Sequence, residues 1–209
     1  MKNHRNIIIN AVLFFMAMAF LESAVVIYLR ELLYPDGFTF PLEPMKEIII
    51  ITELAREFAT IVMLWTVGYL TGTNKSTRFA WFLIGFGIWD IFYYVFLYVF
   101  LQWPASLLEW DILFLIPIPW YGPVIAPCII SALMILFGAM ILHFNNKEQN
   151  LKLSFISIVS VLIGCGLTLY TFMADFVKSM GENLSWTNSD DIMRHSQIYI
   201  PREYSYLLF

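Results

Sequence analysis

The sequence predicts an all-α protein: a polytopic integral membrane helical bundle of about five transmembrane helices plus one short interfacial or re-entrant helix. Of the 209 residues, 60% are hydrophobic and 13% are charged, whereas a soluble domain is about 45–50% apolar and about 25% charged. Several apolar runs also reach the length of about 18 residues that a membrane helix needs. So few charges would not cover the surface of a soluble protein of this size.

The first predicted span covers residues 7–29. Lys2, His4 and Arg5 precede it, as basic residues precede the apolar part of a signal peptide. The apolar run is longer than that of a signal peptide, and no small-x-small cleavage site follows it. We therefore expect an uncleaved first helix.

The second and third predicted spans cover residues 45–70 and 78–101. The second carries Glu53, Arg56 and Glu57, and the third carries Asp90 near its middle. Ionisable residues inside a membrane segment are costly and normally face protein or a wet cavity. These two spans therefore carry the main candidates for a functional site.

Residues 104–123 form the most distinctive stretch. Ser106 and Glu109 have the spacing of a capping box, which predicts the start of a short helix. Pro117, Pro119 and Pro123 prevent a regular helix from continuing. We expect an interfacial or re-entrant helix that carries Asp111, followed by an extended segment.

Two further spans are predicted at residues 124–143 and 153–177. They complete a transmembrane domain of residues 1–181, which a polar and aromatic tail of residues 182–209 follows. Lysine and arginine residues are more frequent on the side that holds the N-terminus. This bias predicts a cytoplasmic N-terminus and an external tail, as in a protein of the bacterial inner membrane.

The candidate site is an acidic cluster around the second span. At about 100° per residue, Glu53, Arg56 and Glu57 share one helical face, and Thr60 extends it inward. Other polar residues at a similar depth, in the outer half of the bilayer or near its midplane, belong to other elements: Glu22, Asp90, Tyr93, Tyr94 and Asp111.

Charge balance makes this cluster informative. Four carboxylates, Glu22, Glu53, Glu57 and Asp90, face a single positive charge on Arg56. One midplane carboxylate costs about 2.5–3.5 kcal/mol on insertion scales, so an unrelieved cluster would be poorly tolerated. Protonation, a bound cation or exposure to the interface would each relieve it. The structural alternative is an ion pair within the helix, between Arg56 and its neighbouring glutamates.

The predicted spans lack the residues that several cofactors require. The spans contain no central histidine for haem, no deep lysine for retinal, no zinc motif, and no Glu-x-x-His pattern for a di-iron site. If a metal binds, Glu22, Glu57 and Asp90 form an all-oxygen set that suits Mg²⁺, Ca²⁺ or Mn²⁺.

Three functions remain open. The first is a small transporter, or a transporter subunit, that binds a proton or cation. The second is a membrane-embedded enzyme that acts on a lipid or isoprenoid, with carboxylates as acid and base or as metal ligands. The third is a structural or assembly subunit of a membrane complex. The expected partners are the lipid bilayer and a second copy or a membrane protein. A formal charge of −4 without a basic block argues against nucleic acid.

Overall fold

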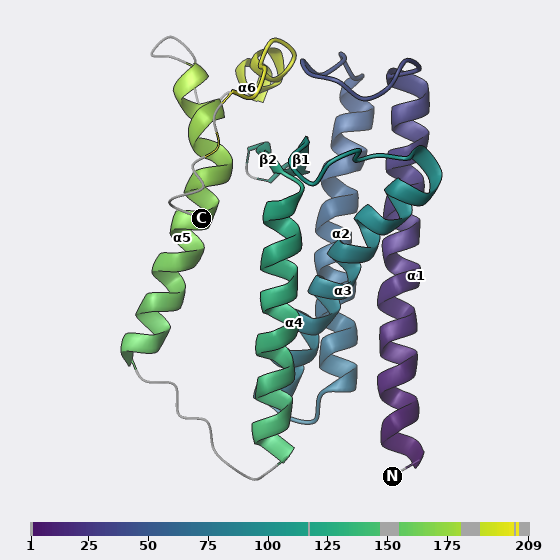
Figure 1. Ribbon diagram of the computed structural model, residues 1–209, viewed down its shortest axis with the longest axis vertical. Coiled ribbons are helices and arrows are strands. Elements are labelled where there is room, and N and C mark those ends of the chain that lie inside the picture. The colour runs from purple at the N-terminus through teal and green to yellow at the C-terminus, as the bar shows by residue number, and fades with distance from the viewer. Residues whose placement is uncertain (1, 117, 147–154, 181–188, 203, 205–209) are drawn as a thin grey trace. The chain divides into compact units, whose positions relative to one another are not determined.

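The computed structural model describes residues 2–116, 118–146, 155–180, 189–202 and 204. The chain divides into two compact units, and each contains separate stretches of sequence. Unit 1 comprises residues 1–28, 58–107 and 125–152, and unit 2 comprises residues 29–57, 108–124 and 153–209. Most of the described residues are helical, which confirms the predicted class (Figure 1).

Unit 1 is built around a closely packed helix pair, α3 (Lys75–Leu101) and α4 (Ile125–Asn146). A Cβ atom on Gly87 would lie 2.5 Å from the carbonyl oxygen of Ser131, and one on Gly138 would lie 2.7 Å from that of Ala80. Each helix thus uses a glycine to approach the backbone of the other, as is typical of membrane helix pairs. The two helices run antiparallel (Figure 1).

The remaining helices of unit 1 are α1 (Lys2–Leu33), up to Tyr28, and α2 (Glu47–Thr71), from Phe58 onward. The ring of Phe15 lies where a side chain on Gly85 would be, and the rings of Phe20 and Phe96 are 5.4 Å apart. Residues later in α1 therefore contact residues later in α3, so these helices run parallel. Their shared core includes Phe15, Leu64 and Trp81.

A tight turn joins α2 to α3. Asn74 caps α3: its side chain accepts the N–H of Thr77, and the Thr77 hydroxyl accepts the N–H of Asn74. This reciprocal pairing satisfies backbone donors that the first turn of a helix leaves free. Within unit 1, Asn74 also donates to the side chain of Asn145 at the end of α4, at 3.0 Å.

Unit 2 contains α5 (Phe155–Met180), α6 (Ser189–Ser196) and a two-stranded antiparallel hairpin, β1 (Trp110–Phe114) and β2 (Trp120–Pro123). It also holds the ends of α1 and α2 that face the loop between them. Its core is aromatic: Tyr121 packs against Phe176 and Tyr199, with ring centroids 5.3 Å and 4.7 Å away. The hairpin is thus covered by α5 and by the chain that follows α6.

The predicted helix within residues 104–123 is wrong, because this stretch forms the hairpin. Trp110 to Phe114 is rich in aromatic and β-branched residues, which favour a strand. At the open end of the hairpin, just before β1 and just after β2, the carbonyl of Glu109 accepts the N–H of Val124 at 2.9 Å. The residues that follow Glu109 favour a strand, so the Ser106–Glu109 pattern did not start a helix.

The other predicted elements match helices with ends that differ by a few residues. Four helices in the described residues are long and apolar enough to cross a membrane: residues 5–33, 75–101, 125–145 and 159–180. α2 is not among the four, since Glu53, Arg56 and Glu57 lower its mean hydropathy. The start of the predicted tail, residues 182–188, lies outside the described residues, and α6 was not expected within it.

Candidate functional site

The predicted site residues belong to both units. Unit 1 holds Glu22, Asp90, Tyr93 and Tyr94, and unit 2 holds Glu53, Arg56, Glu57 and Asp111. Each group has a geometry of its own, so each is described separately. The convergence of all eight residues on one site stays a prediction.

Asp90 is bound by a hydroxyl from the neighbouring helix. The Oγ atom of Ser131 in α4 donates to Oδ2 of Asp90 in α3 at 2.7 Å. Asp90 lies 11 residues before the end of α3, which places it about 16 Å from that end. This hydrogen bond therefore joins two candidate membrane spans, near the middle of α3 and about 9 Å from the start of α4.

Glu22 has a matching arrangement. Thr60 of α2 donates to Oε2 of Glu22 in α1 at 3.1 Å. The next residue, Ser23, donates to the backbone carbonyl of Tyr93 in α3 at 3.1 Å, and also to that of Ala19. Hydrogen bonds at this level therefore connect all four helices of unit 1. We call these residues the polar layer: Glu22, Ser23, Thr60, Asp90, Tyr93 and Ser131.

The two predicted tyrosines lie together in α3. Tyr93 brings its backbone carbonyl to the polar layer, and a role for the two hydroxyl groups stays a prediction. The rings of Tyr93 and Tyr94 contact each other edge-to-face at 4.9 Å, and Tyr94 also lies against Trp103.

Hydroxyl partners suit a carboxyl group in either charge state. A serine or threonine hydroxyl donates to a carboxylate, and its oxygen accepts a hydrogen bond once the carboxyl group is protonated. An arginine partner can only donate, so it favours the charged form. The polar layer can therefore gain or lose a proton while each hydroxyl–carboxyl hydrogen bond is kept.

Asp111, by contrast, is part of a buried ion pair in unit 2. Arg30, near the end of α1, donates from Nη2 to Oδ1 of Asp111 at 3.0 Å, and Asp111 is only 2% exposed. The guanidinium also lies 4.3 Å from the ring centroid of Phe38. The pair joins the hairpin to the end of α1, so Asp111 has a structural role here.

Glu53 and Arg56 form the intrahelical ion pair that the sequence allowed, with Nε of Arg56 3.0 Å from Oε2 of Glu53. Glu57 is used differently. Its Oε2 accepts the backbone N–H of Leu115, directly after β1, at 3.0 Å. A buried N–H at the end of a strand needs an acceptor, and Glu57 supplies it.

A metal site is not apparent in the described residues: none of their His, Cys, Asp and Glu side chains form a group of three or more that could hold an ion. The predicted set of Glu22, Glu57 and Asp90 has members in both units, so it stays a prediction.

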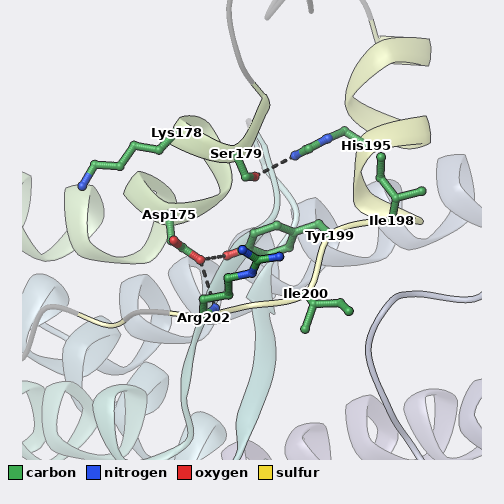
Figure 2. Close-up of a pocket in the computed structure, with 8 residues that line it drawn as sticks. All are labelled: Asp175, Lys178, Ser179, His195, Ile198, Tyr199, Ile200 and Arg202. Atoms are coloured by element: carbon green, nitrogen blue, oxygen red, sulfur yellow. Dashed lines mark hydrogen bonds between the residues drawn. The ribbon is translucent and has the colours of Figure 1, made fainter.

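A pocket of about 490 Å³ lies in unit 2, where sequence reasoning had placed no site. Asp175 and Ser179 from the end of α5 face His195 of α6 and the segment from Ile198 to Arg202, and Lys178 of α5 also lines the pocket (Figure 2). Ser179 contacts Nε2 of His195 at 2.7 Å, and Tyr199 donates to Asp175 at 2.6 Å. These contacts join residues 16 and 24 positions apart, and no local pattern in the sequence predicts such pairs.

Burial controls the ionisation of this pocket. It lowers the pKa of His195, so the neutral imidazole is favoured. It also raises the pKa of Tyr199, and the hydrogen bond to Asp175 adds to that shift. Both side chains are therefore uncharged at neutral pH.

Ser131 and His195 are the main residues that sequence reasoning underrated. Ser131 is one of several hydroxyl residues within apolar runs, so its residue type gave no signal. His195 lies in a polar terminal segment, where its burial could not be inferred.

Comparison with protein-family models, with curated proteins and with solved structures gives no match to this chain.

Proposed function

We propose that this chain is a membrane carrier, or a subunit of one, whose polar layer binds and releases a proton during transport. The observation that carries the proposal is the 2.7 Å hydrogen bond from Ser131 to Asp90 between two candidate membrane spans. Carboxyl groups inside spans are the usual proton relays of pumps and transporters. The hydroxyl keeps Asp90 hydrogen-bonded in both charge states.

A proton fits this layer better than a divalent metal does. Mg²⁺ and Ca²⁺ take at least six oxygen ligands at fixed distances. In the polar layer, Glu22 and Asp90 each bind a hydroxyl from a different helix. One carboxyl group is sufficient to carry a proton.

We further propose that α2 crosses the membrane, which makes five crossings. Contacts within unit 1 support this because α1 and α3 run parallel, so the chain must return across the bilayer between them. Thr60 near the middle of α2 binds Glu22, and Gly68 near its end lies against Phe82 of α3. α2 has 25 residues, so it is about 37 Å long, and a hydrocarbon core is about 30 Å thick. Five crossings would place the termini on opposite sides, and the excess of lysine and arginine on the N-terminal side would then put the N-terminus in the cytoplasm and the tail outside.

Proton movement in proteoliposomes tests the proposed carrier. The purified chain is reconstituted around a pH-sensitive dye, and a potassium diffusion potential drives proton entry. We expect Asp90→Asn to reduce the initial rate of proton entry at least tenfold. The amide side chain of asparagine does not take up and release a proton at the pH of the assay. Glu22→Gln should reduce the rate by a smaller factor, and Ser131→Ala should shift its pH dependence.

Glu47→Gln is the matched control, because Glu47 is an exposed carboxylate in the first turn of α2. It should leave the rate unchanged. Each variant is compared at equal incorporation and equal melting temperature, so that loss of folding is separated from loss of transport. Proton entry at the original rate in both Asp90→Asn and Glu22→Gln would refute the proposal.

A further inference from the structure

The pocket at the end of α5 lies where a membrane helix leaves the hydrocarbon. The candidate span of α5 runs from Val159 to Met180, and three lining residues, Asp175, Lys178 and Ser179, are in its last two turns. Lipid headgroups occupy this level of a bilayer. The pocket volume is within the range of sites that hold small molecules.

We propose that this pocket binds the phosphodiester headgroup of a membrane phospholipid. This site is independent of the polar layer, because it lies in unit 2 and shares no residue with it. The proposal depends on the charges of the pocket, on its apolar rim and on an unpaired acceptor.

The charges of the lining favour an anion. Among the lining residues that the structure describes, the one carboxylate is Asp175, which already accepts hydrogen bonds from the Tyr199 hydroxyl and, at 3.2 Å, from the backbone N–H of Arg202. The two cationic side chains of Lys178 and Arg202 line the pocket and are exposed, and that of Lys178 extends away from the other labelled residues (Figure 2). Lysine and arginine heads are the usual partners of a phosphate group.

Apolar side chains beside these cations suit a lipid better than a free phosphate. Ile198 and Ile200 line the same pocket and are 71% and 52% exposed. Together with the adjacent span, they offer a surface that the glycerol and upper acyl carbons of a lipid can cover. A free phosphate would leave them in water.

His195 selects among headgroups. The hydrogen of the Ser179 hydroxyl is directed to the carbonyl of Phe176 at 2.6 Å, so Nε2 of His195 must carry the hydrogen that it shares with Ser179. Nδ1 is then an acceptor, and this buried atom has no partner among the described residues. Nδ1 is covered in this conformation, so a headgroup with a hydroxyl or ammonium donor, such as phosphatidylglycerol or phosphatidylethanolamine, would satisfy it after the imidazole turns Nδ1 toward the pocket.

The same geometry argues against a serine nucleophile in this pocket. A Ser–His pair acts as a base-activated nucleophile only if the serine gives its hydrogen to the imidazole. The pocket therefore suits binding.

Calorimetric titration of the full chain in maltoside micelles tests the site with soluble, short-chain lipids. We expect dihexanoyl-phosphatidylglycerol to bind and dihexanoyl-phosphatidylcholine, which lacks a headgroup donor, to bind more weakly. Replacing both cations, Lys178→Gln with Arg202→Gln, should weaken phosphatidylglycerol binding about tenfold, because charged hydrogen bonds are lost. His195→Phe should abolish the preference between the two lipids.

Arg194→Gln is the matched control, since Arg194 is an exposed cation of α6 that does not line the pocket. It should leave binding unchanged. Equal binding by the double variant and the wild type would refute the pocket as the site. Inorganic phosphate that competes at the same concentration as the lipid would refute the lipid as the ligand. Transport by the polar layer is measured separately, so either proposal can fail alone.

Discussion

Individual carboxylates in this chain have two kinds of partner. Asp111 and Glu53 are paired with arginines, which can only donate hydrogen bonds. Asp90 and Glu22 accept hydrogen bonds from hydroxyl groups, which serve either form. Removing one partner of a buried ion pair typically costs about 3–5 kcal/mol, so the Arg30–Asp111 pair is better suited to holding the hairpin than to releasing a proton.

His195 makes the docking of α6 dependent on pH. Burial lowers its pKa below the ordinary value of 6.5 in the docked state, so an undocked imidazole binds a proton more tightly. Docking is therefore fully stable above about pH 6.5 and weakens as the pH falls below it. Amide hydrogen exchange in α6, corrected for the intrinsic effect of pH, should show less protection at pH 5.5 than at pH 7.5.

The control for this prediction is His195→Gln, which stays neutral at both pH values. Its protection should not change between them. The same loss of protection in the variant and the wild type would show that another group is responsible.

Residue types alone predicted part of the site. The Glu53–Arg56 pair follows from a spacing of three residues on a helix, and Thr60 was placed on the inward face of α2 from its spacing. The partner of Asp90 was not predicted, because Ser131 is 41 residues away. Such a contact depends on how two helices pack, which a single sequence does not specify.

At the scale of elements, helices were predicted well and the hairpin was not. Long apolar runs dominate the composition of the spans, so α1, α3, α4 and α5 appear close to their expected positions. The hairpin consists of two short strands, of five and four residues. The prediction gave more weight to a four-residue capping pattern than to the β-forming residues of the strands. The stability of the hairpin depends on packing against α5 and on the Arg30–Asp111 ion pair.

Packing between α3 and α4 gives a prediction for glycine substitutions. Gly87→Ala and Gly138→Ala each place a Cβ atom within 2.7 Å of a backbone oxygen on the other helix. We expect each to destabilise unit 1 by about 1–3 kcal/mol, the usual cost of overpacking. Thermal unfolding in detergent, followed by circular dichroism, measures the loss.

Gly164→Ala in α5 is the matched control. A Cβ atom there meets no described atom within 4 Å, and alanine favours a helix over glycine by about 0.5–1 kcal/mol. This variant should be as stable as the wild type or slightly more stable. Equal destabilisation at all three positions would mean that the α3–α4 contact is not as close as described.

At the scale of the whole molecule, the number of crossings determines where the termini lie. Four crossings place both termini on one side of the membrane, and five place them on opposite sides. The parallel arrangement of α1 and α3 supports five, although α2 is not among the four described helices that are long and apolar enough to cross a membrane.

Reporter fusions in bacterial cells distinguish the two topologies. We expect alkaline phosphatase fused after residue 209 to be active, because that enzyme folds only outside the cytoplasm. A fluorescent protein that folds only in the cytoplasm should be bright when it is fused to the N-terminus. Fusions to the turn at Asn74 supply the internal reference, and activity of the same reporter at both termini would contradict five crossings.

The division of unit 1 into separated stretches of sequence also has a consequence for its biosynthesis. Ser131 follows Asp90 by 41 residues, and a ribosome adds about 5–20 residues per second. Asp90 therefore exists for about 2–8 s before its hydroxyl partner is made, and Glu22 waits similarly for Thr60. During that interval, the hydrogen bond from Ser131 is not available to Asp90. The order of translation thus makes the completion of the polar layer a late event that awaits α4.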